Sequence, residues 1–423
     1  MTGLRGYATV LREPRFARYF LGESISSVGD AMSEVTIVVL AIMLATEDTR
    51  PVAIALASTA YLVPGILTGV VAGRLLSRLD ARTLLLADNL WRGVLLGAAA
   101  VLAVTHELGL AGYVILLGLA SLSRPLGAAG SRAIVLAVVP RDRLFAANSL
   151  VGVAVQAAAM IGPAAGGVLI AVAGAGYVLG LDAASFLLFV VCLLNLPGIP
   201  TDPEQVGIAP ARMRGAARRG IRLRDHRAVT GIIVLTGIFH ALYGPFLVGL
   251  ALLGSVADQG LPLPTALGIM WSAFGVGAII GGVAAGYRAS LARVEAVALI
   301  VSGWGIATVL VSIPGGFALP VAAMFLGGLV YAPYGAIVST IMQHKLPERR
   351  LKEASAYLNS VTSGLGPAGT LAGGLLVAAI GAEAGLRWSG ALLVVVGLAS
   401  VMLLRSAERR DAEESNEPAR HLV

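Results

Sequence analysis

Twelve long apolar segments constrain the fold of this chain more than any other feature. A membrane-spanning helix needs about 20 mostly apolar residues to cross roughly 30 Å of hydrocarbon. The sequence supplies twelve such segments between its charged clusters, at approximately 17–46, 52–73, 84–105, 111–133, 148–171, 177–196, 229–255, 263–287, 294–314, 317–341, 355–379 and 386–404. Only 13% of the residues are charged, whereas soluble domains contain about 25%. We therefore predict an all-α integral membrane protein with twelve transmembrane helices.

The basic residues are distributed between the loops in a way that predicts the topology. The chain has 31 Lys and Arg residues and a net charge of +7. If the N-terminus lies inside, only Arg50 and Arg387 fall in outer loops, and Arg92 and Arg124 fall within spans. The positive-inside rule then places both termini in the cytoplasm of a multi-pass plasma-membrane protein. The lipid bilayer is its expected partner, and no nucleic-acid partner is expected because topology explains the basic charge.

The first apolar segment predicts a helix that stays in the protein. It contains three acidic residues, and no small-residue cleavage site follows it, which argues against a signal peptide. Cys192 is the only cysteine, so the sequence excludes an intrachain disulfide and a multi-cysteine metal site. We expect neither a metal nor a cofactor.

One long polar stretch divides six spans from six. We predict a first six-helix bundle over 1–196, a cytoplasmic linker over 197–228, a second bundle over 229–405 and a disordered cytoplasmic tail over 406–423. The Arg-rich end of the linker is either an amphipathic helix on the inner leaflet or a simple solvated segment.

The two halves repeat each other. VVPRDRLFAANSL after the fourth span matches KLPERRLKEASAY after the tenth at a constant offset of 207 residues. In each half a Gly-Pro and then a Gly-Gly follow in the next helix. This repeat predicts two bundles related by pseudo-two-fold symmetry, as in transporters whose site lies between the halves near the midplane.

Four stretches together resemble the major facilitator superfamily, and within it the drug and macrolide efflux branch of proton-linked exporters. They are GESISSVGD (22–30), AGRLLSRLDARTLL (72–85), GPAAGG (162–167) and LDAASFLL (181–188). The resemblance extends over nearly all of residues 15–405 and implies a twelve-helix secondary transporter that is a monomer.

The loop between the second and third spans is similar to the superfamily's signature turn. Gly73, Arg78 and Arg82 match it, but Ser77 stands where an acid is usual and Asp80 where a second glycine is usual. The resemblance implies that this acid helps to lock one conformation. The lock is here either weaker or supplied by Asp80, and a merely basic cytoplasmic turn is the alternative.

The GPAAGG stretch resembles a motif that the family associates with antiporters. Pro163 removes a backbone donor, and Gly162, Gly166 and Gly167 permit close approach of a neighbouring helix. We expect a pliable, tightly packed hinge, with plain helix packing as the alternative.

Ionisable groups inside spans are costly and usually face a cavity or a partner. Glu23, Asp30 and Glu34 lie within roughly 40° on one helix face. Asp30 matches the family's helix-1 acid, and we expect Asp30 and Glu34, near mid-depth, to exchange protons or bind substrate. Glu23 lies near the cytoplasmic end, where it either takes part in this work or only pairs with Arg18 or Arg92.

Arg124 resembles a buried arginine that many family members have beside the proton path. It needs a carboxylate partner, and Asp30 or Glu34 is the simplest choice, with either a coupling or a structural role. Asp88 and Arg92 are four residues apart and are expected to pair with each other on one helix face.

The second half has few charges but several aromatic side chains. Aromatic rings with polar tips suit an amphiphilic, drug-like ligand, although interfacial belts and core packing are alternatives. The predicted substrate-binding residues are Glu34, His240, Tyr243, Trp271, Tyr331, Tyr334 and Asn359.

Motifs of soluble enzymes, including a phosphate-binding Gly-Lys-Ser loop, are missing from the sequence. We therefore expect a transporter, not an enzyme, driven by an ion gradient. The leading hypothesis is proton-driven antiport of an amphiphilic small molecule such as an antibiotic. The alternatives are export of a siderophore or another endogenous metabolite, and a transport-inactive membrane scaffold or sensor.

Overall fold

A computed structural model describes residues 9–76, 79–140, 143–196, 226–253, 261, 263–286 and 293–416, and every regular element in these ranges is a helix. Twelve helices or consecutive helix pairs are long and apolar enough to span a membrane. They coincide with the twelve predicted segments, so the expected all-α membrane fold is confirmed. Most of the expected linker lies outside the described residues.

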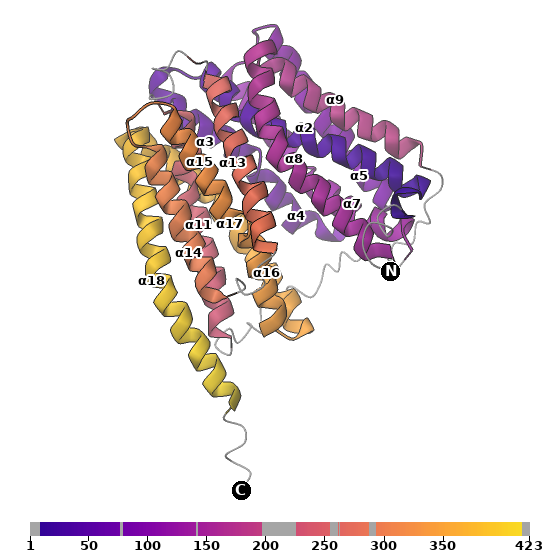
Figure 1. Cartoon of the computed structure of the whole chain (residues 1–423). Coiled ribbons are helices and arrows are strands. Elements are labelled where there is room, and N and C mark those ends of the chain that lie inside the picture. The colour runs from indigo at the N-terminus through magenta and orange to yellow at the C-terminus, as the bar shows by residue number, and fades with distance from the viewer. Residues whose placement is uncertain are drawn as a thin grey trace. The chain divides into compact units, whose positions relative to one another are not determined.

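The chain divides into two compact units. The first unit comprises Met1–Ala211 with Pro262–Ile269, and the second comprises Arg212–Leu261 with Met270–Val423. Figure 1 colours the first from indigo to magenta and most of the second from pink to yellow.

The first unit is organised around its first long helix. Its elements are α2 (Pro14–Leu44), the 3₁₀ turn η1 (Glu47–Thr49), α3 (Arg50–Ala60), α4 (Val63–Leu76), α5 (Ala81–Val104), α6 (Leu110–Ser121), α7 (Arg124–Val138), α8 (Leu144–Ala173) and α9 (Ala175–Leu194). Helix α2 packs along α8 and α9, and α5 packs against α9 and α7 (Figure 1). Helix α2 is therefore held by helices of its own unit.

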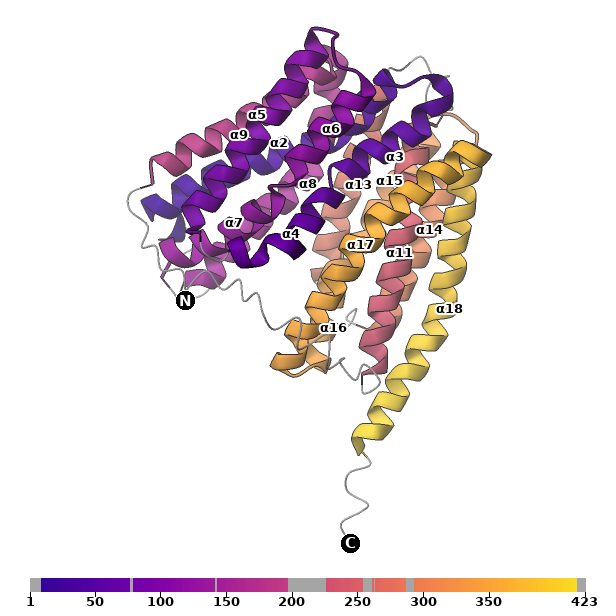
Figure 2. The same ribbon diagram turned by 180° about the vertical axis from the view of Figure 1, so that it is seen from behind.

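The second unit repeats this arrangement. Its elements are α11 (Arg227–Ala251), α13 (Leu263–Gly286), whose first residues group with the first unit, α14 (Val294–Val311), α15 (Ala318–Tyr331), α16 (Tyr334–Lys345), α17 (Glu348–Ile380) and α18 (Ala382–Asn416). Helix α11 packs along α17 and α18, and α14 packs against α18 and α15 (Figure 2). These contacts match those of α2 with α8 and α9 and of α5 with α9, as the sequence repeat predicts.

Close helix packing at glycines gives this repeat residue-level detail. A side chain at Gly162 in α8 would collide with Ala31 of α2, and one at Gly369 in α17 would collide with Ala241 of α11. Gly162 and Gly369 are 207 residues apart, the offset of the sequence repeat. Ala31 and Ala241 therefore occupy equivalent places in the two units.

Among the described residues, three spans are broken in the middle, each beside a proline. Helix α3 ends before Pro64, α6 ends before Pro125, and α15 ends before Pro333. Proline has no backbone N–H, so it cannot continue the hydrogen bonds of the helix that precedes it. The backbone N–H of Gly65 donates to Oγ of Ser121 at 3.2 Å, so the α3/α4 and α6/α7 breaks lie side by side.

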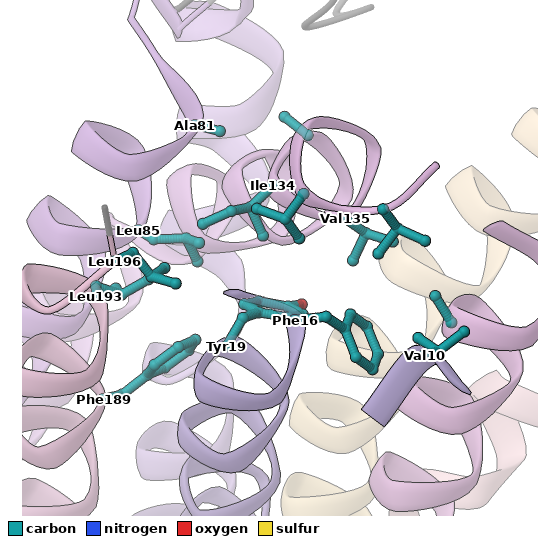
Figure 3. Packing of buried hydrophobic residues seen from close by; sticks show 14 residues of the cluster. Val10, Phe16, Tyr19, Ala81, Leu85, Ile134, Val135, Phe189, Leu193 and Leu196 are labelled. Atoms are coloured by element: carbon teal, nitrogen blue, oxygen red, sulfur yellow. The ribbon is translucent and has the colours of Figure 1, made fainter. Parts of the chain in front are cut away.

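An apolar cluster joins the start of α2 to one end of α5, α7 and α9 (Figure 3). Phe16 and Tyr19 lie at its centre, and the Tyr19 and Phe189 ring centroids are 6.0 Å apart. Arg82 donates to the carbonyls of Leu193 and Leu194 at 3.0 and 2.8 Å. Because the last carbonyls of a helix have no partner within it, these bonds anchor the end of α9 to the start of α5.

The prediction of a disordered tail over 406–423 is wrong for residues 406–416, which are helical. Helix α18 continues to Asn416 (Figure 2), and ion pairs hold it against the second unit: Glu408 with Lys345 at 2.5 Å and Arg405 with Glu295 at 3.0 Å. Asp411 accepts hydrogen bonds from the backbone N–H groups of Arg227 and Ala228, at 3.0 and 3.1 Å. A residue of α18 thus caps the N-terminus of α11.

We expect Asp411→Ala to lower stability by about 0.5–2 kcal/mol, the usual effect of losing a helix N-cap. The measurement is the temperature at which the detergent-solubilised protein loses its folded form. Asp411→Asn keeps one acceptor oxygen and should lose less. An unchanged melting temperature for Asp411→Ala would show that α18 does not stabilise α11.

Candidate functional site

The first unit holds a cluster of charged side chains around Asp30. Gly162 and Gly166 of α8, in the motif predicted to allow close packing, lie against Ala31 and Met32 of α2. Their contact fixes α2 at the residues that follow Asp30. These small residues therefore help to set the position of Asp30.

Asp30 is held by two side chains from other helices. Arg92 of α5 forms a two-pronged ion pair with it: Nη1 donates to Oδ2 at 3.2 Å, and Nη2 donates to Oδ1. The hydroxyl of Tyr61 donates to Oδ1 at 2.7 Å and accepts from Nη2 of Arg92 at 2.8 Å. The Arg92 side chain is 6% exposed and the Asp30 side chain 31% exposed, so the guanidinium is buried while part of the Asp30 side chain stays uncovered.

Among the described contacts Arg124 forms an ion pair with neither Asp30 nor Glu34, the two partners that the sequence predicts for it. Its guanidinium lies over the ring of Tyr61, 4.6 Å from the ring centroid, and its buried Nη1 has no hydrogen-bond partner among the described residues. It acts on Asp30 and Glu34 only through longer-range electrostatic attraction. Arg92 of α5 donates to Asp30 and so takes the place that was predicted for Arg124.

The expected pair of Asp88 and Arg92 is also wrong. Asp88 is 5% exposed and accepts a hydrogen bond from Oγ of Ser123 at 2.6 Å, while Arg92 turns to Asp30 and lies 4.1 Å from the ring centroid of Phe186. Spacing on one helix permits a local pair but does not enforce it when a neighbouring helix offers a carboxylate.

The other acids of α2 differ in their surroundings. Glu23 accepts a hydrogen bond from Oγ of Ser131 at 3.0 Å and pairs with neither Arg18 nor Arg92 among the described contacts. Glu34 is exposed on the first unit, and the described residues give it no ion pair. Of these acids of α2, Glu34 is thus exposed and Asp30 is held in an ion pair.

The signature turn gives only part of its expected picture. Ser77 and Arg78 lie outside the described residues, and Gly73 lies in the last turn of α4. Asp80 accepts a hydrogen bond from the backbone N–H of Thr83 at 3.2 Å, which makes it the N-cap of α5. This hydrogen bond of Asp80 joins residues only three apart in the sequence.

The second unit brings most of the predicted substrate residues together in an aromatic cluster. Trp304 of α14 lies at its centre, with ring centroids 5.0–6.4 Å from five neighbours. These neighbours are Phe239, Tyr243, Phe246, Phe274 and Tyr331. His240, Trp271 and Tyr334 each touch one or more members of the cluster. Asn359 is exposed on α17 and has no ring contact with it.

The hydrogen bonds of the cluster define what it offers to a ligand. Nδ1 of His240 lies 2.8 Å from the carbonyl of Thr236. Since a carbonyl only accepts, Nδ1 must have the proton, and Nε2 of the neutral ring is then an acceptor. Trp304 is 2% exposed, and its Nε1 donor has no partner among the described residues.

The charged and aromatic clusters occupy equivalent places in their units. The charged residues are Asp30, Arg92 and Arg124, and their counterparts are His240, Trp304 and Tyr334. Asp30 and His240 directly precede the equivalent residues Ala31 and Ala241. Arg92 precedes Gly93, which packs on α9, and Trp304 precedes Gly305, which packs on α18. Arg124 and Tyr334 begin α7 and α16, directly after the proline-linked breaks. The repeat has thus diverged into a charged centre and an uncharged aromatic one.

Tyr61 is a residue of the charged cluster that was not among the predicted site residues. The signal that could have found it is its place beside Pro64 within a span, where a polar tip needs a partner. Arg92 is noticed as an intramembrane charge, but its partner depends on a fold that brings α5 to α2.

A twelve-helix membrane protein built from two repeated units, with charges inside one and aromatic rings inside the other, belongs to the class of secondary transporters. Comparison with known proteins specifies the family. A family model described as transmembrane secretion effector matches residues 6–423. The chain belongs to this family of the major facilitator superfamily.

Curated relatives include the enterobactin exporters EntS of Shigella boydii serotype 18 and Escherichia coli O139:H28. Each is 25% identical over 292 residues, which are 64% of this chain and 64% of the relative. The chain thus aligns with less than two thirds of the length of these relatives. Their names concern a siderophore exporter, and the drug and macrolide branch is not confirmed.

Solved structures support the fold. A bacterial homologue of the human lysosomal transporter Spinster, in an inward-facing and unoccupied conformation, matches with a TM-score of 0.67 and 12% identity over 99% of this chain and 100% of that chain. The peptide transporter POT in complex with sulfate matches with a TM-score of 0.69 and 16% identity, over 93% and 95%. The family and these structures are transporters, not enzymes.

Proposed function

We propose that the chain is a proton-driven antiporter that exports an amphiphilic small molecule with aromatic groups by alternating access. The observation that supports this most is the charged centre of the first unit. A carboxylate and two arginines inside a bundle are costly to keep in a membrane unless they have a function. We place both termini in the cytoplasm on the distribution of basic residues, and we infer a monomer.

The proton side of the proposal rests on Asp30, Glu34 and Arg124. Glu34 is the exposed acid, and Asp30 is partly exposed beside the two arginines. Protons from outside bind to these carboxylates and lower the affinity for substrate. Release of the protons to the cytoplasm restores that affinity.

The substrate side rests on the aromatic cluster of the second unit. His240, Tyr243, Trp271 and Tyr331 are partly exposed there. The described core of this cluster contains no charged side chain, so it suits an uncharged aromatic ring, with Nε2 of His240 as an acceptor for a hydroxyl or amide N–H. Glu34, exposed on the first unit, suits a basic group of a substrate.

The test is gradient-driven efflux of a fluorescent amphiphilic dye from membrane vesicles. We expect the Asp30→Asn/Glu34→Gln double variant to lose gradient-dependent efflux by about tenfold or more, since coupling energies in proteins typically span 5–150-fold. Glu47→Gln is the control, because Glu47 is 87% exposed between two spans. Undiminished efflux by the double variant would remove both acids from the proton path. No transport by the wild type of any tested compound would favour the scaffold or sensor alternative.

A second candidate function is export of a siderophore, and the similarity to enterobactin exporters favours it. Competition separates the two: enterobactin should inhibit dye efflux if both use the same aromatic residues. A chain that transports only enterobactin is a dedicated siderophore exporter, and one that transports only the dye has the drug-efflux role.

A further inference from the structure

Tyr61 lies where three structural features meet. It is the C-cap residue of α3 and lies in the break that precedes Pro64. Its hydroxyl joins Asp30 to Arg92, and its ring lies beneath the guanidinium of Arg124. Arg124 in turn is the first residue of α7, directly after the α6/α7 break. The Tyr61 side chain therefore connects the Asp30 carboxylate with the two broken spans of the first unit, α3/α4 and α6/α7.

The contacts of Asp30 all come from donors. Oδ1 accepts from Tyr61 and Arg92, and Oδ2 accepts from Arg92. A proton that binds to either oxygen removes the charge that the guanidinium faces and one acceptor position. Protonation of Asp30 therefore competes directly with its bonds to Tyr61 and Arg92.

We propose that Tyr61 and Arg92 are positioning residues that tie proton uptake at Asp30 to the bends in α3/α4 and α6/α7. With Asp30 charged, the bonds hold the end of α3 against α2 and keep the Tyr61 ring under Arg124. With Asp30 protonated, the Tyr61 hydroxyl is released, and the α3/α4 break loses its anchor to α2. The inference rests on the proposed proton coupling and adds the residues that convert it into helix movement.

The surroundings of Asp30 fit this role. The titratable or charged groups that act on it come from four other helices and from α2 itself. They are Tyr61, Asp88, Arg92, Arg124 and Asp182, together with Glu23 and Glu34 of α2. Helix α8 has no titratable side chain, and α6 supplies Tyr113, whose hydroxyl lies 3.5 Å from the carbonyl of Ile37. Within this set only Arg92 and Tyr61 donate to Asp30, so they set its affinity for a proton directly.

Removing the Tyr61 hydroxyl tests the proposal without removing the ring. Tyr61→Phe keeps the surface beneath Arg124 but takes one donor from a charged carboxylate. We expect the pH midpoint of gradient-driven dye efflux to move upward by about one unit, because a hydrogen bond to a charged group favours its charged form by about that much. Tyr113→Phe is the matched control: it removes a buried hydroxyl of the same unit and should leave the midpoint unchanged.

A second readout does not depend on transport. Hydrogen–deuterium exchange of peptides across residues 57–68, expressed relative to the intrinsic amide exchange rate at each pH, should rise as the pH falls in the wild type, because the bond between Tyr61 and Asp30 opens. In Tyr61→Phe and Asp30→Asn it should be high at every pH. Exchange independent of pH in the wild type, or a Tyr61→Phe midpoint equal to that of the wild type, would overturn the proposal. If instead wild-type efflux needs no proton gradient while the exchange still responds to pH, the linkage stands and the proposed function falls.

Discussion

Replacing Arg92 with Gln should destabilise the first unit by about 3–5 kcal/mol near neutral pH, because it leaves the Asp30 carboxylate unpaired inside the bundle. Arg92 is 5% exposed and gives Asp30 both prongs of its ion pair. The loss should shrink in acid, where Asp30 can take up a proton. The measurement is the thermal stability of the purified protein in detergent at two pH values.

The double variant Asp30→Asn/Arg92→Gln provides the critical comparison. Removing both charges leaves no unpaired ion, so this variant should be more stable than Arg92→Gln alone. Arg387→Gln is a control, since the ion pair of Arg387 with Glu383 is 47% exposed on both sides and should contribute no more than about 1 kcal/mol. An Arg92→Gln protein as stable as the wild type would contradict the pairing described for Asp30.

Trp304→Ala should have the other large effect, a loss of about 3–5 kcal/mol in the stability of the second unit. Trp304 is 2% exposed and contacts five aromatic rings from α11, α13 and α15. Its removal leaves a cavity that the surrounding helices cannot fill without moving. Thermal unfolding of the detergent-solubilised protein measures the loss.

Trp388→Ala is the matched control, because Trp388 belongs to the same unit but is 70% exposed. It should change stability far less than Trp304→Ala. Equal melting temperatures for the two variants would show that the aromatic cluster does not hold the second unit together. A Trp304→Ala protein that stays folded should also bind the dye more weakly, because the rings around it lose their fixed positions.

The twelve spans are predictable because the length of an apolar segment is a local property of the sequence. Every backbone polar group in a bilayer must be satisfied within the segment itself, so a long apolar run has few alternatives to a helix. The repeat is equally visible, since the offset of 207 residues relates sequence motifs and also the packing glycines Gly162 and Gly369.

The polar contacts are less predictable because they join segments far apart in sequence. Asp30 and Arg92 are 62 residues apart, and the hydrogen bond from Arg227 to Asp411 joins residues 184 apart. Spacing rules find partners only on the same helix, which is why Asp88 is assigned to Arg92. The continuation of α18 is missed because its contacts are with the distant start of α11. Knowledge of which helices pack together is what these assignments need.

The charged and aromatic centres show a further limit of sequence reasoning. The acids of α2 and the rings of the second half can each be found as residue types in spans. Their equivalence within the repeat becomes visible only through the packing of Ala31 and Ala241 against α8 and α17. Tyr61, which connects the charged centre to two helix breaks, has no motif of its own in the sequence.

The most direct test of proton-driven export uses purified protein in liposomes that enclose a pH-sensitive dye. A gradient of enterobactin or of a fluorescent amphiphilic compound is imposed across the membrane, and the internal pH is followed. We predict that movement of the compound in one direction drives protons in the other, and that the Asp30→Asn/Glu34→Gln variant shows no such proton movement. Movement of the compound through the wild type without any change in internal pH would contradict proton-coupled antiport.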